Sequence, residues 1–177
     1  MLDRETRLAL LLDHYRRPRH RAPLPDADTR AAGGNPGCGD VVTIYLQAAP
    51  DGARIHRASF DGSGCTLSQA AASMLMERVN RDHPTLDEVT ALSYQEVIAT
   101  LGEDLVQSRP SCATLALGTL KAAVRSLELD QRLRAAGRTE EEIRALKNEL
   151  AERLAEPGLT LTMPATPSAR RSDEPGP

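Results

Sequence analysis

The sequence has very few aromatic residues: it contains no tryptophan, one phenylalanine and three tyrosines, or 2% of its 177 residues. Its hydrophobic core must therefore be built from Leu, Ala, Val, Ile and Met. The 40% hydrophobic content is enough for one domain of modest size plus an additional segment. No uninterrupted apolar run approaches the roughly 20 residues that a membrane-spanning helix needs, so we expect no membrane partner.

The sequence also lacks an excess of basic residues. Its 22 Lys and Arg residues are outnumbered by 25 Asp and Glu residues, which gives a formal net charge of −3. Because nucleic-acid-binding proteins neutralise phosphates with basic side chains, this balance argues against nucleic acid as the main partner. Residues 1–5 are charged and do not resemble a signal peptide, so we expect a cytoplasmic protein.

Cysteine is scarce, and the three residues Cys38, Cys65 and Cys112 are odd in number. An odd count argues against a complete disulfide framework, and reduced cytosolic cysteines more often bind metal or take part in catalysis. Each cysteine lies beside Gly, Pro or Ser, where the backbone turns, and Asp40 follows Cys38 by two residues. Three thiolates and one carboxylate suit a four-coordinate site for Zn²⁺ or for an iron–sulfur intermediate.

Two strand-forming runs, residues 41–48 and 54–61, flank the dipeptide Asp51-Gly52 and predict an antiparallel hairpin. A hairpin brings its two outer ends to the same side. The residues before the first strand, including Cys38 and Asp40, should therefore lie near Cys65, which follows the second strand. The preceding residues 21–37 are rich in Pro, Ala, Gly and Asp, and we expect them to form an irregular, mobile lead-in.

Apolar periodicity predicts helices around this hairpin, so the expected fold class is α+β, with a small antiparallel sheet packed against several helices. The helices are predicted over residues 2–17, 66–80 and 112–127, with two shorter helical pieces between residues 86 and 101. The apolar face predicted for the first helix consists of Leu8, Leu11, Leu12 and Tyr15. Cys65 and Cys112 should each lie at a helix N-terminus, where free N–H groups favour a thiolate.

An additional helix is predicted within residues 137–156, beyond the main domain of residues 1–136. Thr139 and Glu142 have the spacing of a capping box at its start. Its apolar stripe consists of Ile143, Leu146, Leu150 and Leu154. We expect this helix to fold back on the domain, with pairing to a partner helix as the alternative. Residues 157–177 contain five prolines and few apolar residues, which predicts a disordered tail.

Four short motifs follow one another between about residue 5 and residue 127. They are Asp13-His14-Tyr15-x-x-Pro18-Arg19, Asn35-Pro36-x-Cys38-Gly39-Asp40, Gly64-Cys65-x-x-Ser68 and Arg109-x-x-Cys112-Ala113-x-Leu115. Together they resemble the NifU N-terminal/IscU family of iron–sulfur cluster assembly proteins. The resemblance implies a SufE/NifU-like fold for this part of the chain and does not extend beyond about residue 128.

The residues around the third cysteine indicate which branch of the family the sequence resembles more. IscU-type scaffolds place a histidine immediately before this cysteine, whereas this sequence has Ser111. Arg109 and the run 112–115 resemble the SufU branch, although the interval from Cys65 to Cys112 is too short for the extra segment that SufU proteins usually carry. SufU-type proteins bind Zn²⁺ and take persulfide sulfur from a cysteine desulfurase. The resemblance implies zinc ligation by Cys38, Asp40, Cys65 and Cys112.

Two functional hypotheses follow from the resemblance. In the first, the protein is a SufU-like carrier that borders on an enzyme: Cys38 accepts sulfur from a SufS-like cysteine desulfurase, and a downstream iron–sulfur scaffold or apo-protein receives it. Arg109 would pair with Asp40 or steady a thiolate, or else it is a solvated surface residue. In the alternative, the protein is an IscU-like scaffold that binds iron or a [2Fe–2S] cluster through the three cysteines. A purely structural zinc domain is a third, less favoured hypothesis.

Overall fold

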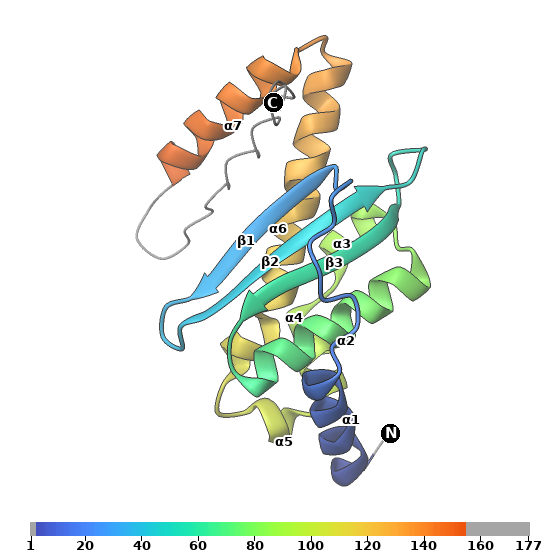
Figure 1. Ribbon diagram of the computed structural model, residues 1–177, viewed down its shortest axis with the longest axis vertical. Helices are drawn as coiled ribbons and strands as arrows, with labels where there is room; N and C mark the ends of the chain where they lie inside the picture. Colours follow the sequence, from blue (N-terminus) through green and yellow to red (C-terminus); the bar gives the residue numbers. More distant parts are fainter. Residues whose placement is uncertain (1–2, 155–177) are drawn as a thin grey trace, which may run out of the picture.

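The computed structural model describes residues 3–154 and has the predicted α+β architecture (Figure 1). The elements are α1 Arg4–Arg16, β1 Thr29–Asn35, β2 Asp40–Ala48, β3 Ile55–Ser63, α2 Thr66–Asp82, α3 Leu86–Ala91, α4 Tyr94–Leu101, α5 Glu103–Val106, α6 Pro110–Ala135 and α7 Glu140–Leu154. None of the helices in this described part combines the length and apolar character needed to cross a membrane.

The three strands form an antiparallel sheet in the order β1-β2-β3. The predicted hairpin is the β2–β3 pair, and Gly52 in its turn has a φ of +70°, which favours glycine. The register pairs Asn35 with Asp40 and Val41 with Ser63. The β1–β2 turn and the end of β3 therefore meet at the same end of the sheet, as the hairpin argument predicted.

Strand β1 corrects the expectation that residues 21–37 are irregular. This Ala- and Gly-rich strand has little intrinsic strand preference, but it pairs with β2 along its whole length. Packing against α6 explains why small residues are needed here. A Cβ at Gly33 would lie 2.1 Å from Oγ1 of Thr119, so glycine allows the strand backbone to approach the helix. Strand β1 therefore forms because of tertiary packing, and its local composition does not predict it.

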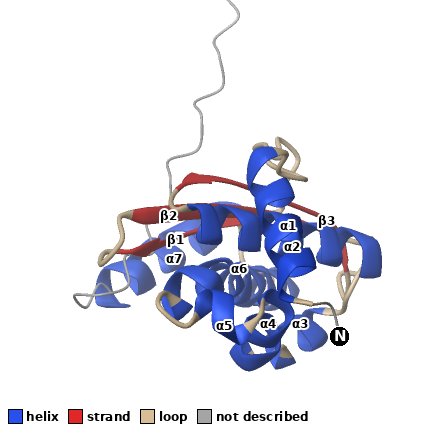
Figure 2. Cartoon of the chain, turned by 90° about the horizontal axis from the view of Figure 1, so that it is seen from below, coloured by secondary structure: helices blue, strands red, loops and turns tan. Residues whose placement is uncertain are grey.

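The core lies between the sheet and the helices that cover one of its faces, with α6 beneath the sheet in Figure 2. Its largest fully buried side chains include Phe60, Ile44, Leu46, Met76, Leu117 and Leu120. Helix α6 is longer than the predicted 112–127 at both ends: it continues to Ala135, and it starts at Pro110, whose fixed φ suits the first position of a helix. Cys112 therefore lies inside the first turn of α6 and does not precede it.

Helix α1 buries only part of the predicted apolar face. Leu8 and Tyr15 are 39% and 44% exposed, whereas Leu11 and His14 are buried. The imidazole of His14 is only 2% exposed because α2 offers it polar partners: its Nδ1 lies 2.8 Å from Oγ of Ser73, and its Nε2 lies 3.5 Å from a carboxylate oxygen of Glu77. An apolar-periodicity argument does not detect a buried histidine that is satisfied in this way.

His14 is connected to α2 through Ser73 and Glu77. The backbone N–H of Arg19 donates to Oγ of Ser73 at 2.7 Å, and the same oxygen lies 2.8 Å from Nδ1 of His14. Nε2 of His14 faces Glu77. Burial, followed by the nearby charge of Arg19, lowers the pKa of His14, and the carboxylates of Glu77 and Asp13 only partly oppose this shift. The Asp13-to-Arg19 motif thus joins α1 to α2.

Helix α7 agrees with the helix predicted within residues 137–156 and has the predicted capping box. The Thr139 amide donates to the Glu142 carboxylate at 2.9 Å, and the Glu142 amide donates to Thr139 Oγ1 at 3.3 Å. The helix folds back on α6 through buried Ile143 and through a 2.8 Å ion pair between Lys147 and Asp130. The predicted tail, 157–177, lies outside the described residues, and the division into domains stays a prediction.

We predict that Ile143→Ala lowers the free energy of unfolding by about 2 kcal/mol, because it removes the apolar anchor of α7. The matched control is Leu146→Ala on the same helix, which changes stability by no more than about 0.5 kcal/mol because Leu146 is 41% exposed. Chemical denaturation of both variants measures the difference. Equal losses would show that α7 is not held by Ile143.

We also predict that burial of His14 makes stability depend on pH. The folded imidazole has a lowered pKa, so below about 6.5, the ordinary histidine value, the unfolded chain binds more protons than the folded chain. The stabilising contribution is present above this pH and is lost as the pH falls. Denaturation between neutral and mildly acidic pH should show a flatter profile for His14→Gln. His56→Gln, which changes an exposed histidine, should retain the wild-type profile.

Candidate metal centre

Four side chains predicted as ligands meet at one end of the sheet. Cys38 lies in the β1–β2 turn, Asp40 begins β2, Cys65 is the N-cap residue of α2, and Cys112 lies in the first turn of α6. The Sγ atoms of Cys38 and Cys112 are 3.3 Å apart, and Sγ of Cys65 is 3.4 Å from Oδ2 of Asp40. All three cysteines are free thiols. The structure therefore brings together residues that are separated by up to 74 positions.

The turn that carries Cys38 is fixed by Asn35. The carbonyl oxygen of Asn35 accepts hydrogen bonds from the amides of Cys38 and Gly39, at 3.1 and 2.9 Å, and its side-chain oxygen accepts one from the amide of Gly37. Gly39 has a φ of +68°, so glycine is needed to complete the turn. The side chain of Cys38 is consequently held at an exposed position on an ordered turn.

Asp40 is only 2% exposed, and its carboxylate contacts the start of α2. Its Oδ1 accepts a hydrogen bond from the amide of Cys65 at 2.9 Å. Burial acts to raise the pKa of Asp40, but the hydrogen bonds from this amide and from the thiols of Cys112 and Cys65 outweigh it and lower the pKa. Asp40 is therefore an ionised oxygen donor next to two sulfur atoms.

Cys65 lies where the sequence placed it, at the N-terminus of a helix. Its Sγ accepts a hydrogen bond of 3.5 Å from the amide of Ser68, as an N-cap side chain does. The hydroxyl of Ser68 lies 3.7 Å from the same sulfur. Sequence reasoning gave Ser68 no role, although its fixed spacing from Cys65 in the Gly64-Cys65-x-x-Ser68 motif was a signal.

Cys112 does not repeat the N-cap geometry of Cys65, because α6 begins two residues earlier. It is only 1% exposed, and the side-chain amide of Asn35 lies 3.6 Å from its Sγ. Burial, followed by contacts with Cys38 and Asp40, raises the pKa of the Cys112 thiol, so it holds its proton until a cation displaces it. Asn35 also lies in one of the four motifs, and the sequence alone predicted no role for it.

Arg109 is exposed and precedes the first residue of α6. Its carbonyl oxygen accepts a hydrogen bond from the amide of Cys112 at 3.1 Å, so its backbone helps to start the helix. Within the described residues its guanidinium forms neither a hydrogen bond nor an ion pair, and the expected pairing with Asp40 is not present. A supporting role for this side chain stays a prediction.

The donor set is compatible with a tetrahedral cation. Ligand atoms of Cys38, Asp40 and Cys112 all lie within 4.8 Å of one another, and Cys65 adjoins Asp40. Donors at about 2.3 Å from a tetrahedral Zn²⁺ are roughly 3.8 Å apart, so the 3.3 and 3.4 Å contacts need only small adjustments. Cys65 lies outside the 4.8 Å group, so its sulfur must move closer to the other donors when a metal binds. Three thiolates and one carboxylate would more than neutralise the charge of a divalent cation. The residues present therefore fit Zn²⁺.

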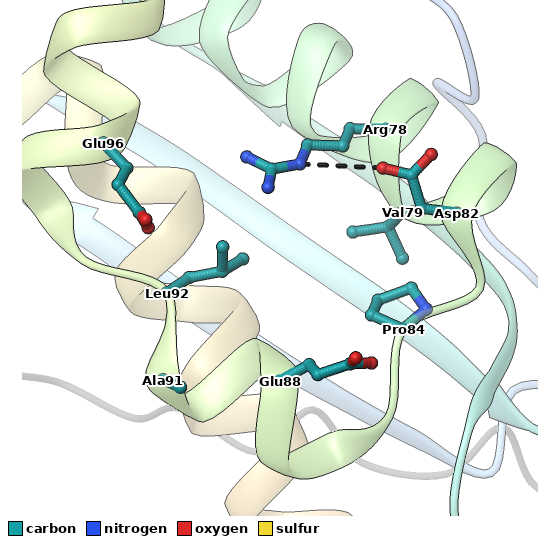
Figure 3. Close-up of a pocket in the computed structure, with 8 residues that line it drawn as sticks. All are labelled: Arg78, Val79, Asp82, Pro84, Glu88, Ala91, Leu92 and Glu96. Atoms are coloured by element: carbon teal, nitrogen blue, oxygen red, sulfur yellow. Dashed lines mark ion pairs between the residues drawn. The ribbon is translucent and has the colours of Figure 1, made fainter.

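The pocket in Figure 3 lies away from the thiols, between α2, α3 and α4. Its charged side chains already have partners. Arg78 and Asp82 form an ion pair of 3.7 Å, and Glu88 and Glu96 each accept hydrogen bonds in a capping box. None of the predicted site residues lines this pocket, so the thiol cluster remains the candidate functional site.

We predict that Gly64→Ala weakens the site. A Cβ at this position would lie 2.9 Å from Cγ of Asp40 and 2.5 Å from Oγ of Ser68, so the carboxylate must move. We expect a loss of about 1–3 kcal/mol in stability and less metal bound per chain. Thermal unfolding and elemental analysis measure these effects. Gly37→Ala is the control, because its nearest atom would be 3.5 Å away; equal effects in both variants would refute the account.

Comparison with known proteins agrees with this site and fold. Residues 8–132 match the family described as NifU-like N terminal domain. The chain is 32% identical over 114 residues to the iron–sulfur cluster assembly scaffold protein IscU 1 of Archaeoglobus fulgidus, covering 64% of this chain and 71% of that protein. It is 30% identical over 113 residues to the zinc-dependent sulfurtransferase SufU of Bacillus subtilis, covering 64% and 69%.

The fold is also found in a solved structure. The N-terminal part of a NifU-like protein from Brucella abortus superposes with a TM-score of 0.56 and 20% identity, covering 67% of this chain and 92% of that chain. This confirms the predicted NifU-like fold. Because the family model matches more than two thirds of the sequence and includes all four converging side chains, the chain belongs to the family of NifU-like N-terminal domains.

Proposed function

We propose that the protein acts in iron–sulfur cluster assembly as a zinc-binding acceptor and carrier of persulfide sulfur. The observation that carries this proposal is the unequal exposure of the three thiols. Cys38 is exposed at the tip of a turn, Cys65 is half-buried, and Cys112 is buried. A sulfur donor can reach Cys38 without opening the site, whereas the other two thiols are placed to hold a metal.

The similarity to Bacillus subtilis SufU, which is named a zinc-dependent sulfurtransferase, supports this proposal. The residue before Cys112 supports it too, because Ser111 offers no imidazole as a further ligand. Zn²⁺ would be held by Cys38, Asp40, Cys65 and Cys112 and would keep the thiols deprotonated and protected from oxidation. The ionised carboxylate of Asp40 and the thiols of Cys65 and Cys112 remain as donors when Cys38 reacts.

The reaction is a thiol exchange with a partner. The Cys38 thiolate attacks the terminal sulfur of a persulfide on a SufS-like cysteine desulfurase, and the thiolate of the donor leaves. Arg109, exposed three residues before Cys112, would meet the anionic persulfide as it approaches. A downstream scaffold or apo-protein then receives the sulfur. Reduced thiols of this kind suit the cytoplasm. We propose that residues 1–136 suffice, because all four ligands lie within them.

The alternative is an IscU-like scaffold. Relatives such as the Archaeoglobus fulgidus protein are named iron–sulfur cluster assembly scaffold proteins. Three converging thiols with a carboxylate also suit a [2Fe–2S] cluster as cargo. In this case iron and sulfide would bind where we propose zinc, and Asp40 would serve as the exchangeable fourth ligand.

We predict about one Zn²⁺ per chain in freshly purified protein and a persulfide on Cys38 after incubation with a cysteine desulfurase and cysteine. Elemental analysis, the visible absorption spectrum and peptide mass spectrometry measure these outcomes. Wild-type protein should stimulate the desulfurase, whereas Cys38→Ala should not. A coloured protein with iron and sulfide but no zinc would favour the scaffold, and persulfide mainly on Cys65 would contradict the role of Cys38.

A further inference from the structure

The site consists of two unequal pairs of side chains. In one pair, the thiol of Cys112 donates a hydrogen bond to the sulfur of Cys38 at 3.3 Å. In the other pair, the sulfur of Cys65 contacts the carboxylate of Asp40 at 3.4 Å and accepts a hydrogen bond from the amide of Ser68. One buried thiol therefore faces the exposed thiol directly, whereas the remaining thiol is engaged by oxygen and nitrogen partners.

We propose that Cys112 is the resolving thiol for a persulfide carried on Cys38, and that it releases the sulfur as hydrosulfide. This inference rests on the proposed sulfur-accepting role of Cys38. When Cys112 is not bound to a metal, its sulfur attacks the inner sulfur of the Cys38 persulfide, and its proton passes to the terminal sulfur. A bond forms between the two cysteine sulfurs, the bond to the terminal sulfur breaks, and that sulfur leaves as HS⁻. The Cys112 sulfur is oxidised, and the terminal sulfur is reduced.

The contact geometry favours attack at the inner sulfur. The 3.3 Å distance joins Sγ of Cys112 to Sγ of Cys38, which is the atom that becomes the inner sulfur of the persulfide. A disulfide requires these atoms at about 2.05 Å, so they must approach by little more than 1 Å. Because Cys38 is exposed on a turn, its side chain can make this movement without disturbing the core.

Asn35 holds the two thiols together. Its backbone carbonyl and side-chain oxygen fix the turn that carries Cys38, and its side-chain nitrogen lies 3.6 Å from Sγ of Cys112. One residue therefore positions both the acceptor and the resolving thiol. Burial of Cys112 also keeps this thiol from reacting with the donor in place of Cys38, because it is only 1% exposed.

The step leaves a disulfide between Cys38 and Cys112, which a dithiol reductant returns to two thiols through a mixed disulfide. Each cycle therefore converts one sulfane sulfur into one hydrosulfide and uses the two electrons of one dithiol. The product is sulfide, the oxidation state in which sulfur is built into an iron–sulfur cluster.

The experiment follows sulfur under anaerobic conditions in the full chain, supplied with a cysteine desulfurase and a limited amount of cysteine. Wild-type protein should carry the persulfide on Cys38 at early times and then give a Cys38–Cys112 disulfide and one sulfide per disulfide, measured over time by peptide mass spectrometry and a sulfide assay. Cys112→Ser should instead accumulate persulfide on Cys38, with sulfide release reduced by about tenfold or more, since the attacking thiol is missing. Cys112→Ala is a second variant that removes the same thiol without placing a serine hydroxyl in the interior.

Cys65→Ser is the matched control, because it also removes one thiol from the proposed metal site. The ratio of sulfide released to persulfide formed should fall in Cys112→Ser but not in Cys65→Ser, and circular dichroism verifies that each variant is folded. Persulfide that persists on Cys38 equally in wild type and Cys112→Ser overturns the resolving role, as does persulfide found on Cys112. If Cys38 stays unmodified even in Cys112→Ser, the proposed acceptor function fails, and the resolving role falls with it.

Discussion

The buried carboxylate of Asp40 joins the sheet to the helices at the end where the thiols meet. Asp40 begins β2 and pairs with Asn35 of β1, while its two oxygens contact the amide and the sulfur of Cys65 at the start of α2. A buried charge is costly unless hydrogen bonds satisfy it, so these contacts must form together. Gly64 leaves the space they need, because any Cβ there would meet the carboxylate.

This arrangement gives the three thiols different environments. Cys38 is held at the surface by the turn that Asn35 organises, Cys65 caps a helix, and Cys112 is buried beneath them. A site whose three sulfurs were equally buried would suit a closed structural metal. One exposed thiol above two sheltered donors is instead suited to exchange with a partner, and Asp40 provides an oxygen donor that is weaker than a thiolate.

Much of this site could be predicted from the sequence because it depends on local structure. The strand-forming run 41–48 and the Asp51-Gly52 turn define a hairpin, and a hairpin necessarily brings Asp40 near Cys65. The position of Cys112 depends on how α6 packs across the sheet, which no local pattern determines. Its membership of the site was predicted from its Pro- and Ser-flanked context, its predicted position at a helix start and the family motif.

The parts that the sequence did not reveal depend on packing between distant segments. Strand β1 looked irregular because its alanines and glycines have low strand preference, yet Gly33 is required by Thr119 on α6. His14 was not part of the predicted apolar face, but Ser73 and Glu77 on α2 satisfy it in the interior. In both cases the deciding partner is more than 50 residues away in the sequence.

The central claim is that three cysteine sulfurs and the carboxylate of Asp40 form one metal site. X-ray absorption spectroscopy at the zinc edge of the purified protein tests it most directly. The account predicts three sulfur donors at about 2.3 Å and one oxygen donor at about 2.0–2.2 Å, with the oxygen contribution altered in Asp40→Ala. A first coordination shell with fewer than three sulfur donors, or one that Asp40→Ala leaves unchanged, would contradict it.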